Sequence, residues 1–144
     1  MRSFLSLALS LFLLLALTLM TAVPARAADG YDYGECVLEI RTYVAAPGKL
    51  DALNKRFDEH TSKLFTKHGI TVIGLAEPAD GDAAKNTQSL MILHRDRASA
   101  DASWKAFRAD PIWIKAKKDS EVDGLLTEKI TSAFMSPTDY SPLE

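Results

Sequence analysis

Cysteine is almost absent from this chain of 144 residues, because Cys36 is the only one. A single cysteine cannot form an internal disulfide, so the hydrophobic core must hold the fold even in an oxidising compartment. Basic blocks are also absent: 17 Lys and Arg stand against 19 Asp and Glu, which gives a net charge of −2. This balance lacks the electrostatic footprint of a nucleic-acid-binding protein, so we expect no nucleic-acid partner.

Motifs of catalysis and metal binding are missing as well. The sequence has no Gly-rich phosphate loop, no Ser/His/Asp order and no paired-carboxylate motif. Its three histidines, His60, His68 and His94, show no i,i+4 spacing, so we expect no metal site built by the protein. The sequence therefore identifies no catalytic residue and no cofactor.

One long hydrophobic run is present, at the N-terminus. It follows Arg2, spans residues 4–20 and precedes Ala25-Arg26-Ala27, which fits a small-x-small cleavage site. An uncleaved membrane anchor is the alternative, but a spanning helix usually needs about 20 residues. We predict a signal peptide over residues 1–27, export to the periplasm or the exterior, and no membrane association after cleavage.

The remaining chain predicts one α+β domain. Residues 28–34 are small and polar and are interpreted as a flexible N-terminal arm, and residues 35–144 as the domain. Alternating apolar side chains predict a strand at 36–44, and an apolar stripe at helical spacing predicts a helix at 49–67. Further strands are predicted at 70–75, 87–95 and 125–135, and helices at 97–108 and between Pro111 and Gly124. This βαββαβ order is the ferredoxin-like arrangement.

Capping residues mark the predicted helix ends. Asp96 and Asp110 are expected to be N-caps, and Pro111 suits a first helical position because its missing N–H costs nothing there. Gly69 stands where a helix C-terminus favours a left-handed residue.

The strand predicted at 87–95 is apolar on both sides. Leu90 and Ile92 alternate with Met91 and Leu93, and a strand with this pattern is usually buried on both faces. Helices in a ferredoxin-like fold cover only one face of the sheet, and a domain of this size should not leave an apolar face open. We therefore predict a homodimer in which a second copy covers the other face.

Six segments in order resemble the NIPSNAP family, over roughly residues 35–143. The most specific are the run from Ala102 to Trp113 and the C-terminal Pro-Thr-Asp-Tyr-Ser-Pro at 137–142. Four others lie at 39–43, 47–50, 64–70 and 120–124, and the C-terminal segment begins at Phe134. The resemblance implies a dimeric α/β barrel, in which two ferredoxin-like sheets face each other around a shared interior. Related dimeric barrels include cofactor-independent monooxygenases and haem-handling proteins.

Four polar residues are candidate ligand-binding groups: Arg41, Tyr43, His60 and His94. Arg41 and Tyr43 share one side of the first strand with Glu39, and we expect that side to face the barrel interior. A guanidinium there can bind a carboxylate in a bidentate manner, although a structural ion pair between Glu39 and Arg41 is the favoured alternative. His60 lies at the edge of the apolar stripe and His94 near a strand end, where each can reach a pocket. Trp104, Phe107 and Trp113 are interpreted as core or dimer packing.

These residues predict a ligand that lies between the sheet and the first helix. It would be a small apolar or carboxylate-bearing molecule, held by Arg41 and by a hydrogen bond from Tyr43, with His60 as a proton carrier. We interpret the chain as an exported, non-catalytic dimeric barrel that binds a small molecule or a partner. The alternative is an enzyme, either monooxygenase-like or haem-handling, and it requires the four candidates to converge on one cavity.

We predict cleavage before Ala28. Intact-mass analysis of the exported protein is expected to show the loss of residues 1–27. A full-length species recovered from the membrane fraction would overturn this prediction.

Overall fold

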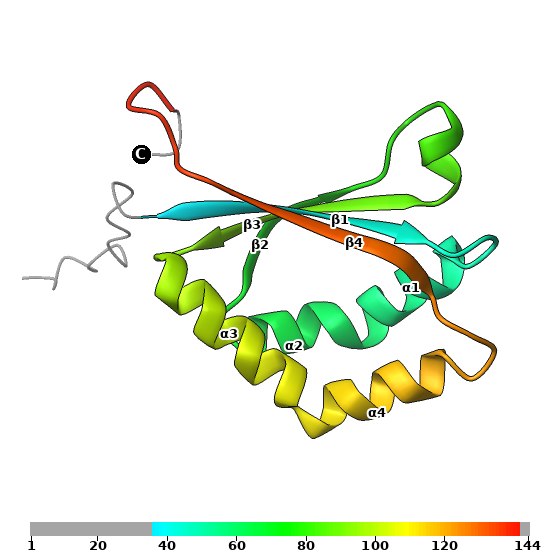
Figure 1. The fold of residues 1–144 in the computed structure, drawn as a ribbon. Helices are drawn as coiled ribbons and strands as arrows, with labels where there is room; N and C mark the ends of the chain where they lie inside the picture. The colour runs from blue at the N-terminus through cyan, green and yellow to red at the C-terminus, as the bar shows by residue number, and fades with distance from the viewer. Residues whose placement is uncertain (1–35, 142–144) are drawn as a thin grey trace, which may run out of the picture. The chain divides into compact units, whose positions relative to one another are not determined.

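A computed structural model describes residues 36–141 of the chain, and Figure 1 shows its fold. The predicted signal peptide (1–27) and arm (28–34) lie outside the described residues. Four antiparallel strands form one sheet in the order β2-β3-β1-β4: β1 (Val37–Ala45), β2 (Thr71–Ala76), β3 (Thr87–His94) and β4 (Thr127–Met135). The helices are α1 (Leu50–Arg56), α2 (Ser62–Lys67), α3 (Arg97–Ala109) and α4 (Pro111–Ser120), with a 3-10 turn η2 at Asp82–Lys85.

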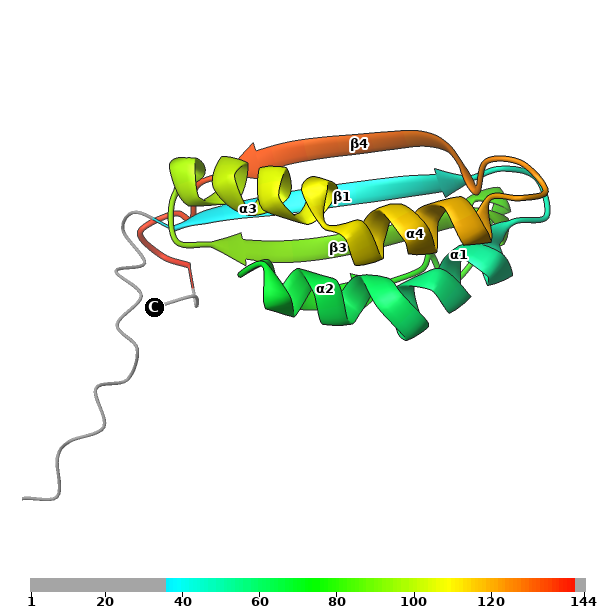
Figure 2. The same ribbon diagram turned by 90° about the horizontal axis from the view of Figure 1, so that it is seen from below.

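The helices form one layer beneath one face of the sheet, as Figures 1 and 2 show together. The predicted βαββαβ order and ferredoxin-like α+β fold are confirmed, and the predicted strand positions hold to within one or two residues. Both layers are amphipathic, so a two-layer packing buries the apolar side of each element against the other layer.

The predicted caps hold the helix ends. Asp96 Oδ1 accepts a hydrogen bond from the Ser99 backbone N–H at 2.6 Å, which starts α3. Asp110 Oδ1 accepts from the Ile112 backbone N–H at 2.8 Å, which starts α4. Gly69 has a φ of 71°, the left-handed conformation that favours glycine after a helix.

Asp110 also ties two helices together. Its Oδ2 accepts from Lys67 Nζ and lies 2.7 Å from His68 Nε2, both at the end of α2. These two partners, together with the Ile112 N–H, hold the pKa of the Asp110 carboxyl well below its usual range. One side chain therefore caps α4 and fixes the C-terminal end of α2 beside it.

The first helix is interrupted, although the sequence predicted a continuous helix at 49–67. A π-helical turn, η1 (Phe57–Thr61), separates α1 from α2. Thr61 Oγ1 donates to the Arg56 carbonyl at 3.1 Å, and Ser62 Oγ donates to the Phe57 carbonyl at 2.9 Å. These hydroxyls supply partners to carbonyls where the ordinary helical hydrogen-bond pattern shifts. The spacing of apolar residues along the sequence does not reveal such a turn. Turns of this π-helical kind occur frequently at functional sites.

Aromatic side chains form the centre of the core between the two layers. The Phe65 ring packs edge-on against Trp104 at a centroid distance of 5.3 Å and against Phe107 at 4.9 Å. Phe57 extends this cluster towards β1, where its ring centroid lies 5.2 Å from that of Tyr43. Trp104 and Phe107 thus pack in the core as predicted, and Trp113 packs against its edge.

The two sides of β1 are exchanged relative to the prediction. Glu39 and Tyr43 contact the helix layer, since Trp104 of α3 donates to Glu39 and Phe57 packs on Tyr43. The prediction that these residues face away from the helices, into a barrel interior, is wrong. Alternation separates the sides of a strand but does not identify which side the helices cover. The hydrogen bond from Trp104 of α3, together with partners on β3 and β4, satisfies Glu39 and so allows this polar side to be the buried one.

The opposite side of the sheet carries an apolar patch that is only partly covered within the described chain, since Leu93 is buried there but Met91 and Met135 are exposed. Leu38 pairs with Leu93 and Met135, and Ile40 pairs with Met91, so these side chains share that face. Met91 is 42% exposed there, whereas Leu90 and Ile92, on the helix side of the same strand, are buried. We call this surface the open sheet face.

We predict that Phe65→Ala lowers the free energy of unfolding by about 3–5 kcal/mol, because it removes a buried ring that three aromatic neighbours contact. Urea unfolding monitored by circular dichroism measures this loss. Ile112→Ala on the exposed side of α4 is the control, with an expected change below about 1 kcal/mol. Equal losses in the two variants would contradict the assignment of Phe65 to the centre of the core.

Candidate ligand-binding site

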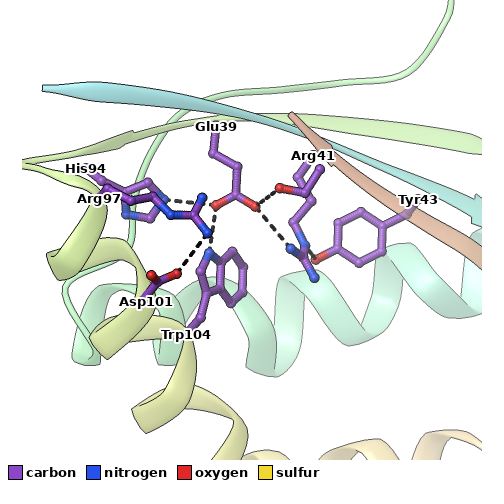
Figure 3. A network of polar contacts seen from close by, with 8 residues as sticks. Glu39, Arg41, Tyr43, His94, Arg97, Asp101 and Trp104 are labelled. Atoms are coloured by element: carbon purple, nitrogen blue, oxygen red, sulfur yellow. Dashed lines mark hydrogen bonds and ion pairs between the residues drawn. The ribbon is translucent and has the colours of Figure 1, made fainter. Parts of the chain in front are cut away.

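A buried carboxylate, Glu39, lies at the centre of a polar network that Figure 3 shows from close by. Its Oε1 accepts hydrogen bonds from Arg41 Nη1 at 3.0 Å and from Ser132 Oγ at 2.6 Å. Its Oε2 accepts from Trp104 Nε1 at 2.6 Å and lies 3.0 Å from His94 Nε2. Four partners from β1, β3, β4 and α3 therefore satisfy one side chain with no exposed surface.

This network keeps Glu39 ionised. Burial alone raises the pKa of a carboxyl, but the hydrogen bonds from His94, Ser132, Trp104 and Arg41 outweigh it and lower the pKa of Glu39 to about 2. Glu39 is thus a fixed negative charge that orients its neighbours at neutral pH.

Arg41 and Tyr43 continue the network towards the middle of β1. Arg41 Nε donates to Tyr43 Oη at 2.9 Å, and the guanidinium carbon lies 4.2 Å from the centroid of the Trp104 ring. Burial raises the pKa of Tyr43, so the phenol keeps its proton and its O–H remains able to donate. The predicted alternative, an ion pair of Arg41 with Glu39, is present at 3.0 Å. Arg41 and Tyr43 nevertheless line a cavity.

That cavity lies between the sheet and the helices and has a volume of about 190 Å³. Six aromatic rings line it, and so do four cationic side chains but only one carboxylate. The rings are Tyr43, Phe57, Phe65, Trp104, Phe107 and Trp113. The charged groups are Arg41, Arg56, Arg108, Lys117 and Glu121. We call this site the layer cavity.

Arg56, at the end of α1, was not predicted as a site residue. Its side chain is 4% exposed, and its Nη1 pairs with Glu121 Oε1 at 2.8 Å and with Ser120 Oγ at 3.3 Å. Its Nε has no hydrogen-bond partner among the described residues. The sequence does contain a sign that Arg56 is unusual: this charged residue lies at position i+3 from Leu53, on the apolar stripe of the predicted helix.

The four predicted site residues do not all meet. Arg41 and Tyr43 lie together at the layer cavity, and His94 is linked to them through Glu39. His94 is buried and lines a separate shallow pocket beside Gly69 and Ser99. His60 lies on η1 with a side chain that is 44% exposed, 3.9 Å from Glu59, and does not line the layer cavity.

Two further properties concern residues 36–141 only. No three His, Cys, Asp or Glu side chains in this range lie close enough together to hold a metal ion. No helix in the same range combines the length and the apolar character needed to cross a membrane.

Fold and cavity together define a ferredoxin-like α+β protein with a candidate binding site between its two layers. Residues 38–142 match the NIPSNAP family, so the chain belongs to this family. No curated protein sequence matches the chain significantly.

Solved structures share the fold. A NIPSNAP family protein with unknown function from Agrobacterium tumefaciens has a TM-score of 0.66 at 22% identity, over 77% of this chain and 96% of its own. An uncharacterized NIPSNAP-like domain protein from Burkholderia xenovorans has a TM-score of 0.65 at 16% identity, over 76% and 90%. A putative antibiotic biosynthesis monooxygenase from Nitrosomonas europaea has a TM-score of 0.53 at 12% identity, over 75% and 95%.

We predict that stability falls as the pH is lowered from about 4.5 to about 2. The folded-state pKa of Glu39 lies below its unfolded value, so its contribution is complete above the unfolded pKa and is lost as the pH falls through the folded pKa. This group accounts for about 2–3 kcal/mol of the fall.

Urea unfolding at successive pH values measures this loss. Glu39→Gln, which cannot ionise, is expected to flatten the curve in this range, whereas Glu59→Gln on the exposed side of η1 leaves it unchanged. Identical pH dependence in the wild type and in Glu39→Gln would contradict the role of the Glu39 carboxylate.

Proposed function

We propose that the protein is an exported, non-catalytic homodimer that binds a small apolar or carboxylate-bearing molecule in the layer cavity. The observation that carries this proposal is the lining of that cavity, in which six aromatic rings meet four cationic side chains. Ligand sites in proteins are typically concave and mostly apolar, with a few placed polar groups that fix orientation.

Arg41 and Tyr43 are the predicted ligand contacts that fit this site. Arg41 is held by Glu39 on one side and by the Trp104 ring on the other, so little side-chain freedom is lost when a ligand binds. Tyr43 accepts from Arg41 and can donate its own proton to an acceptor in the cavity. His60 is not part of this site, so the proposal assigns it no role in binding.

The open sheet face supports the proposed homodimer. Met91 and Met135 are 42% and 45% exposed on it, beside Ile40. A four-stranded face can supply the roughly 800 Å² per partner that a stable interface buries. A second copy of this face matches the first in apolar character, which makes the two-fold pairing of sheets the simplest cover.

The N-terminal sequence supports the proposed export. A hydrophobic run and a small-x-small site precede Ala28, a pattern typical of secretory signal peptides.

An enzyme of the monooxygenase-like class is the second candidate. It is favoured by the similarity to the putative monooxygenase of Nitrosomonas europaea, which shows the fold alone. Among the described residues that line the layer cavity there is no histidine, and Tyr43 is held protonated by burial. A binding role therefore fits the lining better than a proton-transfer role.

Native mass spectrometry of protein purified from its own host tests the proposal. We expect a mass equal to two mature chains, with an additional small molecule that is released on denaturation. A monomer at micromolar concentration would contradict the dimer, and a dimer of bare chains would contradict retained ligand.

Matched variants locate the interface. Met91→Asp places a charge on the open sheet face and is expected to give monomers or aggregates. Ile114→Asp places the same charge at an exposed position of α4, where the side chain is 55% exposed, and is expected to leave the dimer intact.

A further inference from the structure

Arg56, whose side chain lines the layer cavity, has a buried charged donor without a partner in the described chain. Arg56 Nε makes no hydrogen bond to any described residue, although the side chain is 4% exposed and lines the cavity. An unmade hydrogen bond to a buried charged group is costly, and native proteins rarely leave one without a reason. The rest of the guanidinium is well placed, because Nη1 pairs with Glu121 and the group lies 5.2 Å from the Trp113 ring centroid.

The cavity also carries an excess of positive charge. Glu39 compensates Arg41, and Glu121 compensates Arg56. Arg108 and Lys117, both exposed at the lining, make no ion pair within residues 36–141. This excess occurs in a chain whose net charge is −2, so it is local to the cavity and not a property of the whole protein.

Size and wall chemistry limit the molecule that fits. The volume of about 190 Å³ slightly exceeds the roughly 150 Å³ of a cavity that holds benzene. Flat aromatic walls favour a ring, through stacked or edge-to-face contacts. A single ring with one small substituent fills such a space.

We propose that the ligand is a single-ring aromatic carboxylate whose carboxylate accepts a hydrogen bond from Arg56 Nε and faces Lys117 and Arg108. This inference rests on the proposed function, since it names the ligand class of the same cavity. A carboxylate satisfies the unpartnered donor and offsets the excess charge, and the ring lies among the aromatic walls beside Trp104 and Trp113. A neutral ring of the same shape satisfies only the apolar part.

Benzoate and its neutral isostere benzamide separate these contributions. The only two tryptophans of the chain, Trp104 and Trp113, both line the cavity, so intrinsic fluorescence reports occupancy directly. In physiological salt at neutral pH we expect benzoate to bind at least tenfold more tightly than benzamide. Benzamide binding as tight as benzoate overturns the inference and leaves the proposed function standing. If neither binds, the inference fails, and the host-purified protein decides the proposed function separately.

Two variants test the assigned contacts. Arg56→Lys keeps the positive charge beside Glu121 but removes the Nε–H, so benzoate affinity is expected to fall at least tenfold while benzamide affinity stays within twofold. An unchanged benzoate affinity in a folded Arg56→Lys protein overturns the inference.

A matched pair on α4 keeps the test valid if Arg56→Lys does not fold. Lys117→Gln and Lys118→Gln make the same charge change at neighbouring exposed positions, of which only Lys117 lines the cavity. We expect a several-fold loss of benzoate affinity in Lys117→Gln and a change within twofold in Lys118→Gln. Equal affinities in the two variants overturn the inference.

Discussion

The carboxylate of Glu39 is the interaction on which the rest of this structure depends. A buried charge is costly to desolvate, and it is tolerated here because each of its oxygens has two hydrogen-bonding partners. Those partners belong to three strands and a helix, so the carboxylate fixes β1 between its neighbours and α3 beneath them. The carboxylate and its four hydrogen-bonding partners do not contribute equally to the network. Loss of one donor leaves three others on the carboxylate, whereas loss of the carboxylate leaves four polar groups without their acceptor.

The same constraint shapes the candidate site. Because Glu39 holds both Arg41 and Trp104, the cation and the ring that form one wall of the layer cavity stay in place without a ligand. Another part of the lining depends on the π-turn, which carries Phe57 and Thr61, and on Arg56, which Glu121 anchors. The cavity is thus built from preorganised groups, and a preorganised site loses less entropy on binding.

Family membership and site chemistry answer different questions. The similarity to solved NIPSNAP structures extends over most of the domain and accounts for the ferredoxin-like fold. Folds of this kind carry many unrelated functions, so the fold alone assigns none. Individual groups support a bound anion instead: the unpartnered Arg56 Nε, and the cations and aromatic rings that line the layer cavity.

The sequence by itself determined the elements of the domain and their order. Alternation, apolar stripes and caps such as Asp96 and Asp110 act over a few residues, so they can be read along the chain. Arg41 and Tyr43 were also recognisable, as polar groups in an otherwise apolar pattern. Only the tertiary structure decided which side of β1 meets the helices, that His60 lies apart from the site and that Arg56 belongs to it. These outcomes depend on partners far away in the sequence: Trp104 lies 65 residues from Glu39, and Glu121 lies 65 residues from Arg56. Local patterns contain no information about such pairs, because burial and hydrogen bonding are settled only when the two layers pack together.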